Sequence, residues 1–357
     1  MESLVKKKVR DLSPYVVLES EGYTKLDANE NSENLFKRCF NDFVTKVAEG
    51  CINRYPDPSS TTLREKVAKY VGYGDKDNII CGNGSDELIC CLISTFMESD
   101  DVFLTHAPTF SMYKISNQIL GGNFIEVPSD EKFNVNIDGI IKEANSKNAK
   151  LIMLCNPNNP TGTIIKREDI LRVINETKSI VVVDEAYYEF LGESLCDKAI
   201  EMDRVIVLRT LSKAFALAGA RCGYLVSSKN IVNQVLKVKP PYNLNSLTQM
   251  AGEVILDNRD KVFESIERIK KQRDVMIKDL SEIKGIQVFE TGANFVLIKT
   301  EKAGTITNLL KDRKIIVREF SGKYLENCIR LTVGFESENK LVIKTIKEVL
   351  EGENSRA

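Results

Sequence analysis

Histidine is almost missing from this sequence. Among its 357 residues only His106 is a histidine. One imidazole leaves little room for a histidine-rich metal site, and it leaves equally little room for a Ser-His-Asp triad. Any catalysis is therefore expected to depend on lysine, tyrosine and carboxylate side chains.

Paired cysteines are also lacking. The nine cysteines are scattered along the chain and include no C-x-x-C pair. An odd number in this arrangement predicts neither a disulfide framework nor a cysteine-rich zinc site, so no bound metal is expected. Most of these cysteines should be small buried hydrophobic residues.

Neither a strong net charge nor a long apolar run is present. The formal net charge is −1, which gives no overall attraction for nucleic acid or for an anionic membrane, so we expect a small-molecule partner in a local pocket. The initial MESLVKKKVRDL segment has no long apolar core, and no apolar run approaches membrane-spanning length. The sequence therefore predicts a cytoplasmic protein that binds neither nucleic acid nor membrane.

Short apolar runs alternating with helix-like stretches make up the first two thirds of the chain. Several of these runs are continuous, which is typical of strands covered on both faces in a mostly parallel sheet. They are Asn78 to Cys81, Val102 to Thr105, Phe124 to Val127, Leu151 to Cys155, Ile180 to Val183, and Val205 to Leu208. The pattern predicts an α/β fold with a helix-covered central sheet, whose ligands bind outside the carboxyl ends of the strands.

A smaller unit is predicted after a long amphipathic stretch from Leu247 to Lys284. Its expected strands are Gly285 to Lys299, Ile315 to Arg318 and Cys328 to Val333. Its expected helices lie around Thr305 to Lys311 and Glu338 to Glu351. We predict an N-terminal arm (1–45) that packs on the small domain and a large domain (46–245). A connecting helical region (246–284) and a small α+β domain (285–357) should follow.

The segment from Thr210 to Arg221 is chemically the most suggestive. A lysine amine is a useful nucleophile only where its surroundings keep it from remaining a solvated ammonium, so Lys213, beside Ser212 and small apolar residues, is a candidate for Schiff-base chemistry. Ser212 and Arg221 would suit a phosphate. Taken alone, Lys213 is more simply a surface lysine after a strand, so other residues must support the chemistry.

Polar residues follow several of the predicted strands and supply that support. Pyridoxal phosphate needs a lysine, an acid beside its ring nitrogen, donors to its ring oxygen and a cradle for its phosphate. Asp184 follows a buried run and could pair with the ring nitrogen. Gly84, Ser85 and Asp86 lie between a strand and a helix, so their N–H groups could hold the phosphate. Helix capping is the alternative explanation for these positions.

Three further residues could contact the cofactor ring. Asn156, in the N-P-N-N-P-T-G segment, and Tyr187 could both hydrogen-bond the ring oxygen, and Phe110 could stack on the ring. A turn alone would also explain the asparagine segment, and core packing is the usual role of phenylalanine.

Together these segments resemble the histidinol-phosphate aminotransferases, a class II subfamily of the fold-type I pyridoxal phosphate enzymes. The resemblance covers nearly the whole chain, and its last two motifs are the most specific. The motifs are RYPDP (54–58), GNGSDE (82–87), PTFSMY (108–113), NPNNPTG (156–162), DEAYYEF (184–190) and RTLSKAFALAG (209–219).

The resemblance implies a catalytic set and a means of holding the ring. Lys213 would carry pyridoxal phosphate and act as the general base once freed by the amine substrate. Asp184 would pair with the ring nitrogen, and Asn156 and Tyr187 would bind the ring oxygen.

The resemblance also implies a phosphate cradle and a partner. Gly84, Ser85 and Asp86 would hold the phosphate together with Ser212 and Arg221. Tyr55 would reach the cofactor of the neighbouring subunit, which makes a homodimer necessary for activity.

The implied reaction is transamination between histidinol phosphate and 2-oxoglutarate, a step of histidine biosynthesis. Arg330 would meet the anionic end of the substrate, Arg318 and Tyr15 would help to hold the substrate phosphate, and Asn29 would contribute to substrate binding from the N-terminal arm.

Other reactions stay open at this point. After Asn31 the family usually continues with Pro and Gly, but Ser32-Glu33-Asn34 follows here, and Ala220 replaces a bulkier residue before Arg221. An aromatic or other amino-acid aminotransferase, or a threonine-phosphate decarboxylase, would use the same cofactor residues. A transcription regulator with this fold would need a basic helix-turn-helix extension, and none precedes the arm.

Overall fold

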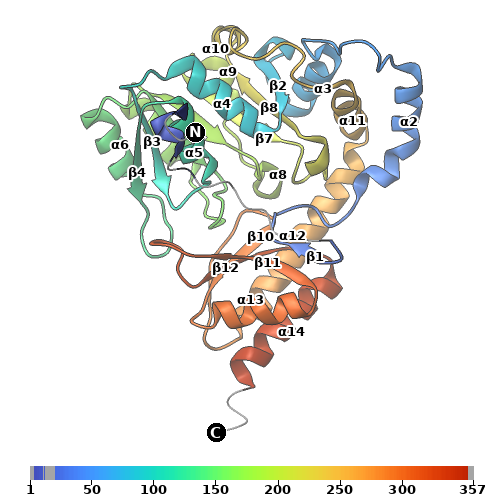
Figure 1. Cartoon of the computed structure of the whole chain (residues 1–357), viewed down its shortest axis with the longest axis vertical. Coiled ribbons are helices and arrows are strands. Elements are labelled where there is room, and N and C mark those ends of the chain that lie inside the picture. The colour runs from blue at the N-terminus through green and yellow to red at the C-terminus, as the bar shows by residue number, and fades with distance from the viewer. Residues whose placement is uncertain (1–3, 11, 13–20, 353–357) are drawn as a thin grey trace.

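Two β-sheets, one in each lobe, organise the protein. The computed structural model describes residues 4–10, 12 and 21–352. Within this part of the chain, a seven-stranded sheet forms the upper lobe of Figure 1 and a five-stranded sheet forms the lower lobe. This arrangement confirms the predicted α/β fold with a smaller second domain.

The large sheet is parallel except for one strand. Its order is β2-β8-β7-β6-β5-β3-β4, and β8 runs antiparallel to both of its neighbours. The strands are β2 (Ile79–Asn83), β3 (Val102–Ala107), β4 (Asn123–Pro128), β5 (Leu151–Cys155), β6 (Ile180–Asp184), β7 (Val205–Thr210) and β8 (Cys222–Ser227). The apolar runs predicted all of these except β8, whose first residues include Gly223 and therefore lack a β-branched run.

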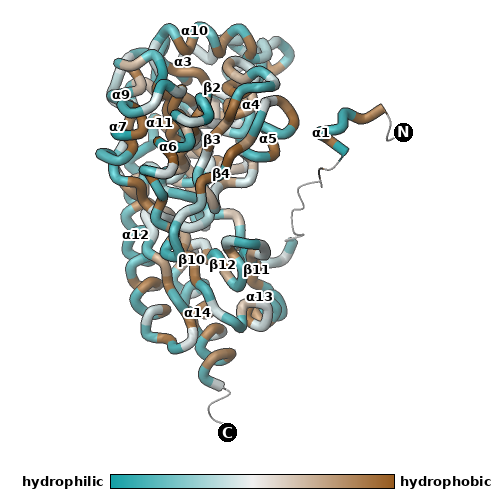
Figure 2. Tube along the Cα trace, turned by 90° about the vertical axis from the view of Figure 1, so that its left-hand side faces the viewer, coloured by the Kyte–Doolittle hydropathy of each residue, from teal (hydrophilic) through white to brown (hydrophobic). Residues whose placement is uncertain are grey.

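Alternate residues of the central strands face two different hydrophobic clusters. Val181 and Val183 of β6 belong to one cluster and Val182 to the other, as expected when helices cover both faces of a sheet. Figure 2 shows the hydrophobic segments gathered along β2, β3 and β4. The helices of this lobe are α3 (Thr61–Val71), α4 (Ser85–Phe96), α5 (Met112–Leu120), α6 (Ile137–Ser146), α7 (Arg167–Glu176), α8 (Tyr188–Leu191), α9 (Cys196–Glu201) and α10 (Lys229–Val235), with short 3₁₀ turns η3 (Lys76–Asn78) and η4 (Ala218–Ala220).

The small sheet has the order β1-β11-β12-β10-β9. Its elements are β1 (Thr24–Leu26), β9 (Gln287–Val288), β10 (Phe295–Lys299), β11 (Ile315–Phe320) and β12 (Cys328–Thr332), with helices α13 (Ala303–Asp312) and α14 (Glu336–Glu351). The single strand predicted from 285 to 299 is wrong, because the chain turns between β9 and β10. There the Gly292 N–H donates to the Gly162 carbonyl of the large lobe at 2.9 Å.

The predicted connecting stretch is two helices, α11 (Ser246–Asp257) and α12 (Arg259–Ser281). Asn258 separates them, and its side-chain amide donates back to the Val254 carbonyl at 3.0 Å. Figure 1 shows α12 running from the large lobe down to the small one. None of the helices within residues 4–10 and 21–352 combines the length and the apolar character needed to span a bilayer.

The N-terminal segment is shared between the lobes, which corrects the prediction that all of it packs on the small domain. Strand β1 pairs with β11 of the small sheet. Helix α1 (Lys7–Arg10) instead lies against the large lobe, where Lys8 Nζ donates to the Gly121 carbonyl after α5. The 3₁₀ turn η2 (Leu35–Cys39) and α2 (Phe40–Glu49) contact α11. The arm has too few apolar residues to form its own core, so its parts are held by contacts with the two lobes.

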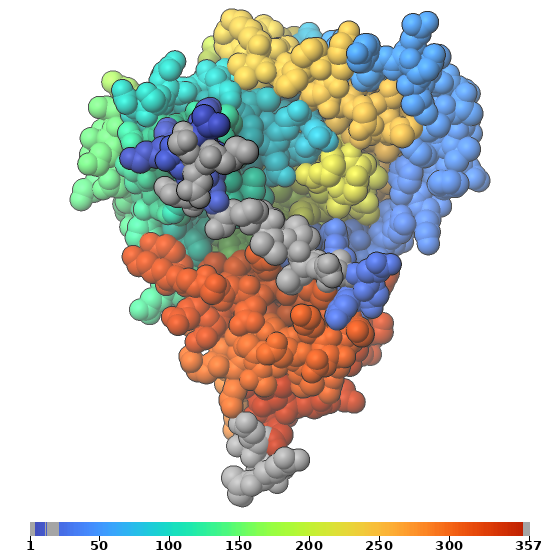
Figure 3. All heavy atoms as spheres, viewed as in Figure 1, coloured from blue at the N-terminus to red at the C-terminus, as the bar shows by residue number. Residues whose placement is uncertain are grey.

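The two lobes meet along a broad boundary, visible in the space-filling view of Figure 3. A small cluster of apolar residues bridges it, in which Phe133 from the loop after β4 packs on Phe289 of the small lobe with ring centroids 4.7 Å apart. The boundary places the arm segment around Asn29 next to the carboxyl ends of the large-lobe strands.

Candidate active site

A partly enclosed cavity lies at the carboxyl ends of the parallel strands. Its walls come from the residues that end or follow β2, β3, β5, β6 and β7, where ligands bind in open α/β sheets. The lining residues are Ser85, Asp86, Phe110, Cys155, Asn159, Asp184, Ala186, Tyr187, Thr210, Ser212, Lys213 and Arg221. Residues predicted from separate motifs therefore lie together.

Lys213 points its amine into this cavity. Its Nζ donates to the Ala28 carbonyl at 2.7 Å. Burial, and then the nearby positive charge of Arg330, lower the pKa of Lys213 to about 8. A larger fraction of this amine is therefore neutral near pH 8 than for a solvated lysine, and the neutral amine is the nucleophile.

This lowered pKa predicts the pH dependence of Lys213 labelling by a small aldehyde and cyanoborohydride. Because only the neutral amine reacts, labelling at Lys213 should rise about tenfold per pH unit up to pH ~8 and then level off. Mass spectrometry of the digested protein measures the rate, with Lys344, whose side chain is 73% exposed, as an internal reference. A rate at Lys213 that still rises tenfold per unit above pH 9 would contradict the prediction.

Asp184 lies at the base of the cavity and is only 3% exposed. Its Oδ2 accepts a hydrogen bond from the Tyr113 hydroxyl at 2.6 Å, and its Oδ1 accepts from the Ala186 N–H at 3.1 Å. Burial raises the pKa of this carboxyl to about 6, and the two hydrogen bonds oppose that rise. A cationic N–H group in the cavity would find an acceptor here, and its charge would favour the ionised carboxylate.

Tyr113 contacts the cavity residue Asp184, and the motifs did not predict this contact. It belongs to the P-T-F-S-M-Y segment, from which only Phe110 was predicted to face a ligand. Tyr113 is completely buried, and its ring meets that of Phe110 edge to face at 5.5 Å. Phe110 itself lines the cavity. The bond to Asp184 joins residues 71 positions apart, which no local pattern reveals.

An anion cradle is formed where β2 meets α4. Gly84 has a φ of 80°, which starts α4 with the Ser85 N–H at the helix N-terminus. Ser212 Oγ lies 3.5 Å from an Arg221 Nη, and the other Nη contacts Asp86 Oδ2 at 3.2 Å. The cradle thus combines a helix N-terminus, a hydroxyl and a guanidinium.

Two further residues shape this cradle and were not predicted. Thr210 lines the cavity, and its hydroxyl donates to Ser212 Oγ at 2.9 Å. Gly223 lies against the turn: a Cβ at this position would be 2.4 Å from the Ser85 nitrogen. Only glycine allows β8 to pass so close to the start of α4.

Asn156 is not among the residues that line the cavity, and its predicted contact with the ring oxygen stays a prediction. Both ends of its side-chain amide are bonded to the backbone of Ile165, at 2.8 and 3.1 Å, so it holds the loop. Asn159, in the same motif, lines the cavity and accepts a hydrogen bond from Arg330. The repeated Asn-Pro pairs make the two asparagines equivalent in sequence, and only the path of the loop distinguishes them.

Tyr187 lines the cavity and is 3% exposed. Its hydroxyl accepts a hydrogen bond from the Asn29 Nδ2 at 2.8 Å. Asn29 was predicted to bind substrate, but its side chain is 1% exposed and faces Tyr187 and Thr332. Asn29 therefore contacts the cavity residue Tyr187, and its predicted contact with substrate stays a prediction.

Arg330 is held at the boundary between the lobes. It donates to Asn159 Oδ1 and to the Asp27 carbonyl, and its guanidinium lies 5.7 Å from the Phe320 ring. Arg318 lies directly across from it in the β11–β12 pair. Arg318 lines a neighbouring groove with Tyr23 and Lys311 rather than the cavity around Lys213. Tyr15 lies outside the described residues.

Tyr55 does not line the cavity of its own chain. It is 80% exposed and stacks on Tyr242 with ring centroids 4.5 Å apart. Ile52 and Leu247 line the same surface groove.

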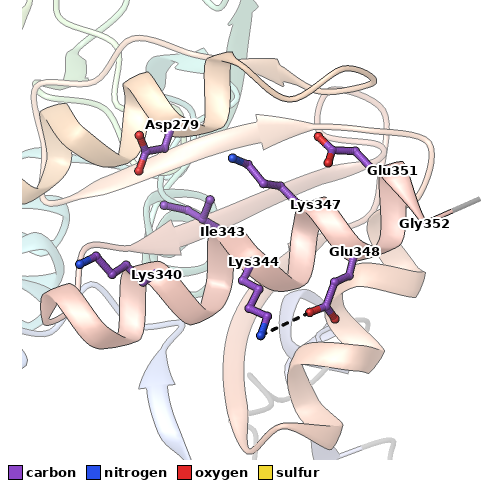
Figure 4. A pocket seen from close by; sticks show the side chains of 8 residues that line it. All are labelled: Asp279, Lys340, Ile343, Lys344, Lys347, Glu348, Glu351 and Gly352. Atoms are coloured by element: carbon purple, nitrogen blue, oxygen red, sulfur yellow. Dashed lines mark ion pairs between the residues drawn. The ribbon is translucent and has the colours of Figure 1, made fainter. Parts of the chain in front are cut away.

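Other parts of the described chain offer no comparable chemistry. Burial lowers the pKa of His106 to about 4, so this side chain is neutral. No group of three His, Cys, Asp or Glu side chains within residues 4–10 and 21–352 could hold a metal ion. A shallow hollow between α12 and α14 is lined mainly by charged side chains (Figure 4). They include Asp279 of α12 and Lys340 and Lys347 of α14.

Comparison with known proteins identifies the family. The sequence pattern of the aminotransferase class I and II family matches residues 21–346. The chain is 40% identical to the histidinol-phosphate aminotransferase of Clostridium novyi (strain NT), over 97% of both proteins. The chain belongs to the aminotransferase class I and II family. The predicted resemblance to histidinol-phosphate aminotransferases is thereby confirmed.

Solved structures of other proteins share the fold. The histidinol-phosphate aminotransferase of Sinorhizobium meliloti, determined in complex with pyridoxal-5'-phosphate, has a TM-score of 0.86 at 23% identity, covering 98% of both chains. The L-threonine-O-3-phosphate decarboxylase of Porphyromonas gingivalis has a TM-score of 0.80 at 25% identity, covering 92% of this chain and 99% of that one. The fold alone therefore does not distinguish transamination from decarboxylation.

Proposed function

We propose that this chain is a pyridoxal phosphate-dependent aminotransferase that moves an amino group between histidinol phosphate and 2-oxoglutarate, a step of histidine biosynthesis. The observation that carries the proposal is the cavity that brings Lys213, Asp184 and the Ser85–Ser212–Arg221 cradle together. The name of the Clostridium novyi relative, 40% identical over nearly its full length, supports the choice of substrate.

The cavity residues fit pyridoxal phosphate on chemical grounds. Lys213 offers an amine whose pKa is lowered to about 8, and Asp184 offers a buried carboxylate with remaining acceptor capacity. The start of α4 with Ser212 and Arg221 offers donors to a dianionic phosphate. Phe110 offers an aromatic face and Tyr187 a hydroxyl.

When bound, pyridoxal phosphate supplies an aldehyde that takes up the amino group and a protonated ring that withdraws electrons from the substrate carbon. The chain's own residues do the rest. Asp184, as a carboxylate, keeps the ring nitrogen protonated. The amine of Lys213 would remove the proton from the substrate carbon that carries the nitrogen and return it to the carbon on the other side of that nitrogen. The half-buried cavity limits access of water to these atoms.

Arg330 is proposed to bind the anionic end of either substrate. Its guanidinium is oriented by Asn159 and by the Asp27 carbonyl, and a planar fork of N–H donors suits both a carboxylate and a phosphate. Arg318, which lies opposite it on β11, adds positive charge where a phosphorylated substrate would extend. Tyr15 is proposed as a further phosphate ligand.

Replacing Arg318 should separate the two substrates. Because the variant can no longer pair a guanidinium with the substrate phosphate, we expect Arg318→Ala to lower kcat/KM for histidinol phosphate by about 10- to 100-fold, the effect of one charged hydrogen bond. The value for glutamate, which has no phosphate, should change by no more than about threefold. Steady-state kinetics with both amines measures the difference.

Lys311→Ala is the matched control for Arg318→Ala, because Lys311 lines the same groove without lying opposite Arg330. It should leave both substrates unaffected. Equal losses for histidinol phosphate and glutamate in Arg318→Ala would show that Arg318 does not recognise the phosphate.

The active form is proposed to be a homodimer in which Tyr55 reaches the cofactor of the partner subunit. Support comes from the exposed aromatic and aliphatic surface around Tyr55, Tyr242, Ile52 and Leu247. Such a patch is typical of a protein interface. The stacking of Tyr55 on Tyr242 would hold the tyrosine in place before the partner arrives.

A cytoplasmic location is also part of the proposal. All nine cysteines are free thiols, which suits a reducing compartment. The binding partners are expected to be the two small-molecule substrates and a second copy of the chain, with no nucleic acid or membrane.

A half-reaction screen tests the proposed function. The loaded protein is mixed separately with histidinol phosphate, phenylalanine, tyrosine and threonine phosphate, and the cofactor absorbance is followed. Histidinol phosphate should convert the cofactor at least about tenfold more efficiently than phenylalanine or tyrosine, because only a phosphorylated amine can pair its phosphate with the arginine pair. Preference for phenylalanine or tyrosine would favour an aromatic aminotransferase, and carbon dioxide released from threonine phosphate would favour a decarboxylase.

A further inference from the structure

The arm segment from Asp27 to Asn29 contacts Arg330 and two cavity residues, Lys213 and Tyr187, at consecutive positions. The Asp27 carbonyl accepts from Arg330, and the Ala28 carbonyl accepts from Lys213 Nζ at 2.7 Å. The Asn29 side chain donates to the Tyr187 hydroxyl at 2.8 Å. Among these three arm residues, Asn29 alone makes its contact through a side chain, so its contact is the one that the sequence specifies.

Asn29 is rigidly held in the position from which it reaches Tyr187. Its φ of 55° lies in the left-handed region, which asparagine tolerates better than most residues. The Asn29 N–H donates to Thr332 Oγ1 at 3.0 Å, and the Asn29 carbonyl accepts from Asn294 Nδ2 at 2.9 Å. Both partners, Thr332 and Asn294, belong to the small lobe. The position of the Asn29 amide against Tyr187 therefore depends on where the small lobe lies.

The contact also decides which way the Tyr187 hydroxyl points. A phenol has one O–H donor, and Asn29 Nδ2 occupies an acceptor position on its oxygen. The O–H is therefore free to donate into the cavity that Tyr187 lines. The Phe295 ring packs edge to face on the Tyr187 ring at 5.3 Å and limits movement of that ring.

We propose that Asn29 is a positioning residue that orients the Tyr187 hydroxyl toward the cofactor's ring oxygen. The inference rests on the proposed function. A hydroxyl that donates to this anionic oxygen takes up part of its negative charge, and so lowers the pH at which the linked Lys213 nitrogen loses its proton. Asn29 thus controls a spectroscopic property of the cofactor without touching it.

A double-mutant cycle on the loaded protein tests the proposal. Cofactor absorbance is titrated with pH in the wild type, Asn29→Gly, Tyr187→Phe and the double variant. Glycine is chosen because it accepts the left-handed φ. Tyr187→Phe should raise the midpoint by about one pH unit, and Asn29→Gly by about half a unit, because a misdirected hydroxyl donates less often. In the Tyr187→Phe background, Asn29→Gly should cause no further shift.

Two additional variants make the result specific. Thr332→Val removes the anchor of the Asn29 N–H and should shift the midpoint in the same direction by less, even if Asn29→Gly folds poorly. Asn339→Ala removes another buried asparagine, whose amide bonds the backbone of Gly334, and should weaken folding without shifting the midpoint.

The outcomes separate this inference from the proposed function. An equal shift in both backgrounds, or no shift from Asn29→Gly while Tyr187→Phe shifts, overturns the role of Asn29. A wild type with no pyridoxal phosphate absorbance contradicts the proposed function itself. Urea unfolding of the four proteins of the cycle, without cofactor, then measures the coupling free energy between Asn29 and Tyr187. A coupling free energy of zero would show that the hydrogen bond between them does not form.

Discussion

Replacement of Lys213 by alanine is expected to abolish amino-group transfer while leaving pyridoxal phosphate bound without a covalent link. The variant removes the Lys213 amine from the cavity but keeps Asp184 and the cradle of Ser212 and Arg221. Loss of a positioned general base lowers the reaction rate by about 10²- to 10⁴-fold. Because the same amine also attaches the cofactor, the loss should lie at or beyond the upper end of that range.

Three measurements check this result together. Single-turnover absorbance with histidinol phosphate gives the rate, and equilibrium dialysis gives the retained cofactor. Borohydride reduction followed by mass spectrometry shows whether cofactor is attached to residue 213. Lys213→Arg is the matched control, since it keeps a positive charge but has no nucleophilic amine, and it should be as inactive as Lys213→Ala. Turnover close to wild type in either variant would remove Lys213 from the mechanism.

Much of this site could be predicted from the sequence, because the carboxyl ends of parallel strands lie at the same edge of a sheet. Polar residues that follow different strands therefore come together there. Asp184 ends β6 and Ser212 and Lys213 follow β7, so continuous apolar runs were sufficient to place their polar neighbours side by side. Gly84 and Ser85 follow β2 in the same way. The register between β6 and β7 then fixes the separation of Asp184 from Lys213.

Side-chain direction could not be predicted in the same way. Asn156 and Asn159 each precede a proline, yet only Asn159 faces the cavity, because the loop turns between them. Tyr113 reaches Asp184 across the inside of the large lobe. Such contacts depend on how helices pack on the sheet, and the sequence pattern carries only the periodicity of each element.

Contacts between the lobes could not be predicted from the sequence either. Asn29 and Tyr187 are 158 residues apart and meet only because β1 joins the small sheet. The pattern around Asn29 is too short and too polar to indicate a strand, so its partner could not be inferred. The division of the N-terminal segment between both lobes has the same cause.

The second large effect is an expected loss of stability when a buried ion pair is broken. The pair joins Arg209 to Glu185, which follows the cavity residue Asp184 in the sequence. Arg209 and Glu185 are 2% and 1% exposed, with Arg209 Nη2 2.9 Å from Glu185 Oε2. Glu185 also accepts from the Leu195 N–H and the Ser194 hydroxyl, and the Arg209 guanidinium lies 3.5 Å from the centre of the Tyr188 ring. The pair fixes the turn after β6 that carries Asp184 and Tyr187.

Arg209→Met should therefore lower the free energy of unfolding by about 3–5 kcal/mol, because it leaves the Glu185 carboxylate buried without its counter-charge. Urea unfolding of the cofactor-free protein measures it through the transition midpoint. Arg172→Met is the matched control: Arg172 also pairs with carboxylates but is 45% exposed, so its loss should cost no more than about 1 kcal/mol. Adding Glu185→Gln to Arg209→Met should recover part of the loss, since no unpaired charge then remains. A cost for Arg209→Met as small as that of Arg172→Met would mean that Glu185 is neutral or hydrated in the folded protein.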